Sequence, residues 1–128
     1  MNTYAIVRQE HLNHHGYLFG GQLLKWVDEF AFIVASRDFT GRNMVTRAMD
    51  KIDFKTRILP GSILRFSIRP ARVGASSAGY VVEVWADEPG ASEEKPVFSV
   101  DITFVAVGPD GRKTALGERP RPLPSERG

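Results

Sequence analysis

The sequence predicts an α+β domain in which a five-stranded antiparallel sheet wraps around one long central helix. Three observations support this fold class. Residues 20–36 form a largely apolar stretch without proline, long enough for about four helical turns. One stretch rich in β-forming residues precedes it and four follow, with Pro, Gly and Ser clusters between the last four. No internal repeat divides the chain, so we expect these elements to share one domain.

The chain begins with a predicted short strand at residues 3–8, followed by a loop in which Asn, His and Gly dominate. The helix over residues 20–36 comes next. Its polar residues form a narrow stripe on a helical wheel, and apolar side chains cover almost all of the rest. The stripe consists of Gln22, Lys25, Glu29 and Ser36. Such a helix is expected to be buried on most of its circumference.

Four further strands are predicted after the helix, and several are long enough for a curved sheet. They span residues 44–54, 62–72, 77–87 and 96–107. Apolar residues occupy every second position in the last two, from Val82 to Ala86 and from Phe98 to Phe104. One face of the sheet therefore requires a cover, and the apolar helix is the element available to provide it.

Composition limits the class of protein. With 128 residues, 42% of them hydrophobic and 25% charged, the chain is in the range of one globular domain with its own core. It contains no cysteine, which excludes disulfides, a thiolate nucleophile and cysteine metal ligands. Its N-terminus lacks the pattern of an export signal, and no window approaches the roughly 18 apolar residues of a membrane span. We therefore predict a cytoplasmic protein without a membrane partner.

The formal net charge of +2 is concentrated near the C-terminus. Residues 112–128 hold five basic and two acidic residues, and the remainder holds 12 basic and 13 acidic ones. Because the excess lies in a proline-rich segment and not on a basic helix, we predict no nucleic-acid partner. The domain is expected to span residues 1–115, and residues 116–128 are expected to form an extended or disordered tail.

Asp28 is the first candidate functional residue, because it lies off the polar stripe of the helix, beside Leu24, Phe32 and Ala35. Burial of an unpaired carboxylate is unfavourable by several kcal/mol, so such an acid is paired, protonated or kept for a function. Two interpretations remain open from the sequence. Asp28 is either a catalytic carboxylate or a surface acid paired with Lys25 or with an arginine from a strand.

Gly20 and Gly21 open the same helix, where unpaired N–H groups and the positive end of the helix dipole can bind an oxyanion. Glycine also lets a substrate approach the backbone closely. The alternative is an ordinary N-terminal turn. Gly21 lies two helical turns, or roughly 10 Å, before Asp28, so an extended substrate or two symmetry-related chains would have to join them.

The loop before the helix contains His11, Asn13, His14 and His15. We predict no metal site there, because the spacing differs from the His-Glu-x-x-His of zinc proteases and no carboxylate pair is close. Asn13, a neutral donor and acceptor, is the candidate for orienting a carbonyl group or a water molecule. The chain also lacks a Gly-x-Ser-x-Gly elbow, a phosphate-binding loop and a dinucleotide fingerprint, which disfavours a serine nucleophile and nucleotide cofactors.

Residues 11–28, HLNHHGYLFGGQLLKWVD, resemble the acyl-CoA thioesterases of the hotdog superfamily. The hallmark of that family is Asn-x-x-Gly-x-x-Phe-Gly-Gly followed by an Asp on the helix. The matching residues are Asn13, Gly16, Phe19, Gly20, Gly21 and Asp28. The resemblance continues through VTRAMDKIDFKTRILPG, RVGASS, EVWA and FVAVGPDGRKTAL, and covers residues 10–115 or so. Lys55 and Arg57 depart from the more usual Leu and Pro, which leaves the acyl-chain preference open.

The resemblance implies a hotdog fold and hydrolysis of an acyl-CoA to a free acid and coenzyme A, without a metal or other cofactor. It also implies a homodimer, with Asn13 and the Gly20 and Gly21 amides of one chain facing Asp28 of the other, and trimers of such dimers. Asp28 would act as a general base or as a nucleophile. Independently of the family, a five-stranded sheet has edge strands whose pairing across a twofold axis would prevent further association.

The turn RVGASS, with Arg72, Gly74, Ser76 and Ser77, is our candidate for contacts to the coenzyme A part, and its alternative is a plain hairpin turn. Two other functions stay open. One is an acyl-CoA binding or sensor module without turnover, which the presence of both Asn13 and Asp28 disfavours. The other is a hotdog dehydratase acting on a hydroxyacyl thioester. That reaction requires a His paired with an acid near the helix, whereas the histidines here precede it.

Overall fold

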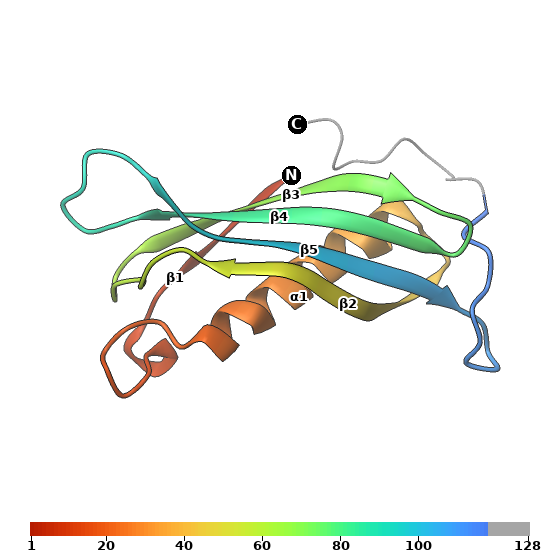
Figure 1. The fold of residues 1–128 in the computed structure, drawn as a ribbon, viewed down its shortest axis with the longest axis horizontal. Coiled ribbons are helices and arrows are strands. Elements are labelled where there is room, and N and C mark those ends of the chain that lie inside the picture. The colour runs from red at the N-terminus through yellow and green to blue at the C-terminus, as the bar shows by residue number, and fades with distance from the viewer. Residues whose placement is uncertain (118–128) are drawn as a thin grey trace.

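Residues 1–117 are described by a computed structural model of the chain, and they form a curved antiparallel sheet around one helix (Figure 1). The elements are β1 (Asn2–Ile6), the 3-10 helix η1 (Gln9–His11), α1 (Gly20–Asp38), β2 (Asn43–Phe54), β3 (Ile63–Val73), β4 (Ser77–Asp87) and β5 (Lys95–Val107). The strand order is β1-β3-β4-β5-β2, and every neighbouring pair is antiparallel. The predicted fold class is confirmed, and the strand bounds agree with the predicted ones within two residues.

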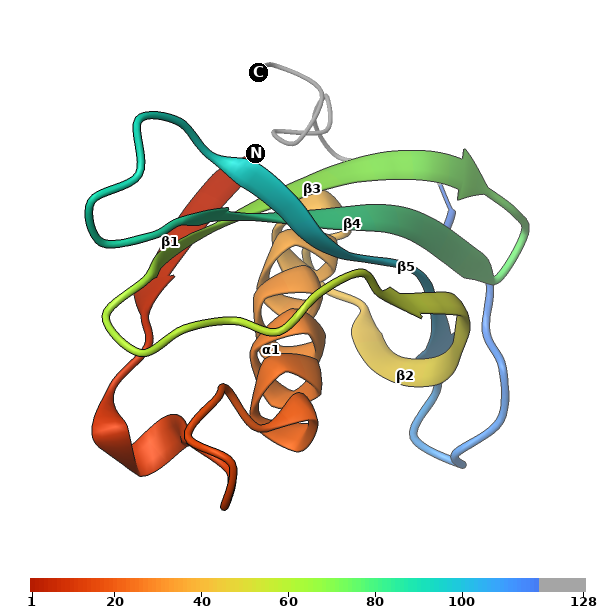
Figure 2. The ribbon, with the colours of Figure 1, turned by 60° about the vertical axis from the view of Figure 1, so that its left-hand side comes forward.

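The hydrophobic core lies between α1 and the concave face of the sheet, as the turned view shows (Figure 2). Leu23, Val27, Ala31 and Val34 recur at helical spacing on α1, and all four are at most 2% exposed. On β4 and β5 the apolar residues of the predicted alternation face the helix and are buried. They are Val82, Val84, Ala86, Phe98, Val100, Ile102 and Phe104. The helix therefore covers the sheet face that the alternation predicted to need a cover.

One flank of α1 differs from the prediction that the helix is buried on most of its circumference. Phe32 and Ile33 remain 40% and 47% exposed. The physical reason is geometric, because one sheet contacts only the side of the helix that faces it. The rest of the apolar surface is left to water in a single chain, and such a patch marks an interaction surface.

The last turn of α1 contains a buried contact that the predicted helix end at Ser36 left out. Asp38 is fully buried and accepts a hydrogen bond from the Tyr80 hydroxyl group at 2.7 Å. The Tyr80 ring in turn contacts Phe104, with ring centroids 6.0 Å apart. This interaction ties the C-terminal end of the helix to β4 and β5.

Two edge strands flank the sheet, and β2 is the longer of them. Val45, Ile52 and Phe54 on β2 are 39%, 44% and 51% exposed. The pairing of β2 with β5 shifts register between Asp50 and Asp53, and Lys51 within this bulge has a φ of 55°. A long edge with exposed apolar side chains favours pairing with another strand.

The outer face of the sheet carries charged side chains instead of a cover. Arg65 on β3 donates a hydrogen bond from Nη2 to Glu94 Oε1 at 2.9 Å, and its guanidinium carbon lies 5.4 Å from the Trp85 ring centroid. The hydrogen bond to Glu94 raises the pKa of Arg65, while its burial acts in the opposite direction. These contacts fasten the segment before β5 to the sheet.

The packed part of the chain extends to Leu116, one residue beyond the predicted end of the domain. Leu116 is 2% exposed, its N–H donates to the Ala75 carbonyl at 2.8 Å, and its carbonyl accepts from Arg42 Nε at 2.8 Å. Most of the predicted tail, residues 118–128, lies outside the described residues. Within residues 1–117, no helix combines the length and the apolar character needed to cross a membrane.

Phe66→Ala is expected to lower the free energy of unfolding by about 3–5 kcal/mol, because the change leaves a cavity in the core. Phe66 is fully buried on β3, and its ring centroid lies 6.2 Å from that of Trp26 and 5.0 Å from that of Phe30. Chemical denaturation would measure the loss. Tyr4→Ala, an aromatic truncation at a residue 59% exposed, should change stability by only about 0.5 kcal/mol. Equal losses in the two variants would contradict this account of the core.

Candidate active site

Asn13 belongs to the loop that leads into α1, and its side chain holds that loop together. Its Oδ1 atom accepts hydrogen bonds from the N–H groups of His15 at 2.9 Å and Tyr17 at 3.2 Å. The backbone N–H of Asn13 donates to the Tyr17 carbonyl at 2.7 Å. Leu18, which follows Tyr17, donates its N–H to the Ile58 carbonyl at 2.9 Å. The loop is thus fastened to the segment after β2. Within residues 1–117 the Asn13 Nδ2 group has no recorded acceptor, so it can still donate to a bound molecule.

The start of α1 presents backbone donors without partners. Phe19 is the N-cap, and its side chain makes no capping hydrogen bond. The Phe19 carbonyl accepts hydrogen bonds from the N–H groups of Gln22 and Leu23, at 3.0 and 3.2 Å. In the described part of the chain, the N–H groups of Gly20 and Gly21 have no recorded acceptor. They lie at the positive end of the helix dipole, where an oxyanion is stabilised.

Gly21 has little room for a side chain, whereas a methyl group at Gly20 would make only ordinary van der Waals contacts. A Cβ atom at Gly20 would lie 3.4 Å from Cε1 of Phe54, and one at Gly21 would lie 2.5 Å from Cε2 of Phe19. At Gly21 the Phe19 ring would have to move to admit even a methyl group. The absence of a Cβ atom at both positions lets a bound molecule approach the backbone closely at this end of the helix.

Asn13 and the helix start line the same pocket, which has a volume of about 320 Å³. Tyr17, Phe54 and Arg57 are among the other residues around it. The structure thus brings Asn13 and Gly20 together from positions that the sequence marked separately. Arg57 enters the same pocket from the segment that follows β2.

Asp28 does not line this pocket, because it lies two helical turns further along α1. It is half-buried beside the β2 edge, and its Oδ1 atom accepts a hydrogen bond from Thr46 Oγ1 at 2.6 Å. Among the described residues no ion pair involves Asp28, so the interpretation as a surface acid paired with Lys25 or a strand arginine finds no support in the single chain. The sequence did not indicate this contact between Thr46 and Asp28.

The family of the chain follows from its match to a protein-family model. Residues 15–93, well over half of the chain, match the thioesterase superfamily. The chain belongs to the thioesterase superfamily. Asn13 lies just outside the matched range and Asp28 lies inside it.

Relatives and solved structures agree with this family. Uncharacterized acyl-CoA thioester hydrolase YkhA of Bacillus subtilis is 31% identical over 112 residues, which cover 88% of this chain and 63% of that protein. A hexameric hotdog fold thioesterase of Campylobacter jejuni superposes with a TM-score of 0.77 at 31% identity, covering 88% of this chain and 86% of that one. An acyl-CoA hydrolase of Staphylococcus aureus, solved with butyryl coenzyme A and coenzyme A, gives 0.75 at 29% identity, covering 90% and 70%. The superfamily member described here has their hotdog fold.

The predicted coenzyme A turn of this thioesterase-superfamily chain lies between β3 and β4, at the end of the molecule opposite the start of α1 (Figure 1). The backbone of the turn makes hydrogen bonds within the chain. The Gly74 N–H donates to the Ser77 carbonyl at 2.7 Å, and the Ser76 carbonyl accepts the Ala106 N–H at 2.9 Å. A single chain therefore keeps this turn at one end of the helix and Asn13 at the other. Whether the turn contacts coenzyme A stays a prediction.

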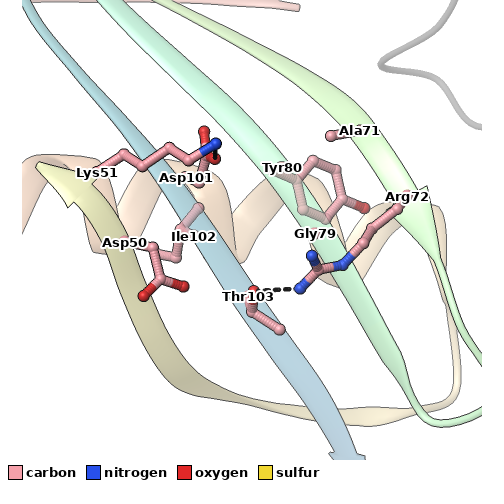
Figure 3. A pocket seen from close by; sticks show the side chains of 9 residues that line it. All are labelled: Asp50, Lys51, Ala71, Arg72, Gly79, Tyr80, Asp101, Ile102 and Thr103. Atoms are coloured by element: carbon pink, nitrogen blue, oxygen red, sulfur yellow. Dashed lines mark hydrogen bonds and ion pairs between the residues drawn. The ribbon is translucent and has the colours of Figure 1, made fainter.

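Of the predicted turn residues, Arg72 belongs to β3. Its side chain lies on the outer face of the sheet, in a pocket of about 540 Å³ (Figure 3). Its Nη2 atom donates to Thr103 Oγ1 at 3.1 Å. Gly79 makes room for this, because a Cβ atom there would lie 3.2 Å from Cγ of Arg72. Lys51 and Asp101, 3.8 Å apart, lie in the same pocket. The pocket holds both signs of charge and shares no lining residue with the pocket of Asn13.

The histidines of this superfamily member are engaged in local contacts. His11 Nδ1 accepts the Arg8 N–H at 2.9 Å, and its ring lies 4.7 Å from the Trp26 ring. His14 and His15 are exposed and lie next to each other. Within residues 1–117 no group of three His, Asp or Glu side chains is arranged to hold a metal ion.

Proposed function

We propose that this chain is an acyl-CoA thioesterase that hydrolyses an acyl-CoA to a free acid and coenzyme A, with Asp28 as its catalytic carboxylate. The observation that carries the proposal is the pocket at the start of α1, where Asn13 and Gly20 meet beside unpartnered backbone N–H groups. Such donors match the negative charge that develops on a thioester oxygen during acyl transfer. Membership of the thioesterase superfamily supports the same reaction.

In the proposed reaction the thioester carbonyl oxygen binds to the N–H groups of Gly20 and Gly21, and Asn13 Nδ2 helps to orient it. Asp28 takes a proton from a water molecule as the water oxygen bonds to the carbonyl carbon. The carbon–sulfur bond then breaks, and the proton passes to the coenzyme A thiolate. In the alternative route Asp28 itself attacks the carbonyl carbon, and the carbon–sulfur bond breaks to expel the coenzyme A thiolate. Water then hydrolyses the resulting anhydride, which frees the acid and restores Asp28, and the proton released passes to the thiolate.

We propose that Asp28 acts on the pocket of a second protomer. Within one chain Asp28 lies roughly 10 Å along the helix from Gly21, too far for both to contact one thioester group. The exposed β2 edge offers a twofold solution. Thr46 and Phe54 are eight positions apart on β2, so an antiparallel pairing centred near Asp50 would bring the Asp28–Thr46 pair of one protomer next to Phe54 and Gly20 of the other.

Similar proteins support this assignment of residues and assembly. Alanine variants of the Staphylococcus aureus hydrolase have been solved for an Asp, an Asn and a Thr. The Asn and the Asp are fifteen positions apart in that enzyme, as Asn13 and Asp28 are here. The Campylobacter jejuni thioesterase is hexameric, which supports a homodimer or a trimer of dimers for this chain.

Release of free thiol from a panel of acyl-CoAs with different chain lengths tests the proposed function. Butyryl-CoA belongs in the panel because the similar hydrolase was solved with it. Turnover by the purified protein would support the thioesterase. Binding of these compounds without turnover would instead favour an acyl-CoA sensor, and hydration of an enoyl thioester would favour a dehydratase.

Thr46→Val is expected to lower kcat/KM about 10-fold, since Asp28 loses the hydrogen bond that holds its carboxylate in place. Thr46→Ser keeps a hydroxyl group and should retain most of the activity. Initial rates of thiol release over a range of substrate concentrations would separate kcat from KM. A valine variant as active as the unmodified protein would remove Thr46 from the site.

A further inference from the structure

Resting on the proposed function, we infer that Arg57 binds an anionic group of the substrate beside the reacting thioester. Arg57 lines the pocket that contains Asn13 and Gly20. Its guanidinium group is a planar cation whose N–H groups match the two oxygens of a carboxylate or a phosphate. Arg57 would therefore add an electrostatic contact to the substrate, which the apolar part of the pocket cannot make.

The pocket has one charged side chain among its lining residues in the described part of the chain, and that side chain is Arg57. No acidic residue lines the cavity. The nearest cation in the sequence, Lys55, is already paired with Asp53, with Nζ 2.7 Å from Oδ2. Within residues 1–117 Arg57 takes part in no recorded ion pair. Arg57 is exposed, so water solvates its charge in the free protein, and the pocket presents a net positive charge to a bound anion.

The position of the Arg57 cation is restricted by Tyr17. The guanidinium carbon lies 5.0 Å from the centroid of the Tyr17 ring, within the range of a cation–π contact. Tyr17 belongs to the loop that Asn13 holds, because its N–H donates to Asn13 Oδ1. The same loop therefore orients the proposed oxyanion site and the Arg57 side chain. This arrangement reduces the conformational entropy that the arginine loses when it binds an anion.

An acyl-CoA can supply the anion from two sources. The coenzyme A part carries phosphates, and an acyl group with a terminal carboxylate carries one at the other end of the thioester. The contact chemistry is the same for both. The apolar residues of the lining, Leu18, Leu23, Phe54 and Ile58, suit the intervening carbon chain, and Thr56 adds one hydroxyl group to the pocket.

The test measures binding of four thioethers, which cannot be hydrolysed: S-butyl-CoA, S-(3-carboxypropyl)-CoA and the two corresponding pantetheine compounds without phosphates. Isothermal titration calorimetry would compare the unmodified protein with Arg57→Met. Arg112→Met is the matched control, because Arg112 is exposed in the turn after β5 and lines neither pocket described above. The expected result is a Kd about 10- to 100-fold higher for Arg57→Met with the anionic ligand that it contacts. Arg57→Lys should restore part of the affinity.

The pattern of losses identifies the source of the anion. Weaker binding of both carboxypropyl compounds, but not of S-butyl-pantetheine, indicates the acyl carboxylate. Weaker binding of both CoA compounds, with the pantetheines unchanged, indicates a phosphate. Equal affinities of the Arg57→Met and unmodified proteins for all four ligands would overturn the inference, as would no binding by the unmodified protein. Failure of the proposed function is seen separately, as absence of thiol release from any acyl-CoA by a protein that binds these thioethers.

Discussion

Asp28→Asn is expected to lower kcat for acyl-CoA hydrolysis by about 10²- to 10⁴-fold, with the fold and the assembly unchanged. Asn has the shape of Asp, and its Oδ1 atom can still accept the hydrogen bond from Thr46. It can neither take a proton from water nor attack a thioester carbon. Thiol release from the best acyl-CoA of the panel would measure the loss, at protein concentrations where the oligomeric state matches that of the unmodified protein.

Glu29→Gln is the matched control for Asp28→Asn. Glu29 is the next residue on α1 and is exposed, and the same removal of one negative charge there should leave kcat within about twofold. Equal losses in both variants would indicate a general effect of helix charge. Full activity of Asp28→Asn would show that another group performs the chemistry.

The fold could be predicted from local patterns in the sequence, because the pattern of apolar residues repeats along each strand and along the helix. Val82 and Phe98 were assigned to the core face from alternation alone, and both are buried. The wheel of α1 showed how much of the helix is apolar, but a wheel holds no information on how much of it one sheet can cover. That is why the exposure of Phe32 and Ile33 was not expected.

The site could be predicted only as far as its residues form a continuous motif. Asn13, Gly20, Gly21 and Asp28 lie in one short segment, and the resemblance of that segment to the hotdog thioesterases is what joins them into one predicted site. Thr46 contacts Asp28 across 18 positions, and the contact depends on how β2 is paired with β5. No pattern in one sequence reports that register. Predicting Thr46 would have required the three-dimensional structure.

The same limit applies to the two positions at which the chain departs from the family pattern. Lys55 and Arg57 looked equivalent in the sequence, two basic residues where the family more usually has Leu and Pro. In the structure only Arg57 lines the pocket, whereas Lys55 is paired with Asp53. Two residues at this spacing would share one side of a regular strand. The chain instead bends at Thr56, and of the two only Arg57 lines the pocket.

Mixing Asn13→Ala with Asp28→Asn is expected to restore activity that neither variant has alone. If each site takes Asn13 from one protomer and Asp28 from the other, a mixed dimer contains one intact site and one site with both defects. After random exchange of protomers in an equal mixture, half of the dimers are mixed, so about a quarter of all sites are intact. Thiol release after joint unfolding and refolding, or after co-expression, would measure this fraction against the unmodified protein.

A chain that carries both substitutions provides the converse control when it is mixed equally with the unmodified protein. In a shared site every mixed dimer is inactive, because each of its two sites has one defect. About a quarter of the unmodified activity then remains, whereas sites formed within one chain would leave about half. No restoration in the first mixture, together with one half in the second, would place Asn13 and Asp28 in one protomer. The roughly 10 Å between Gly21 and Asp28 along α1 would then have to be spanned by the substrate itself.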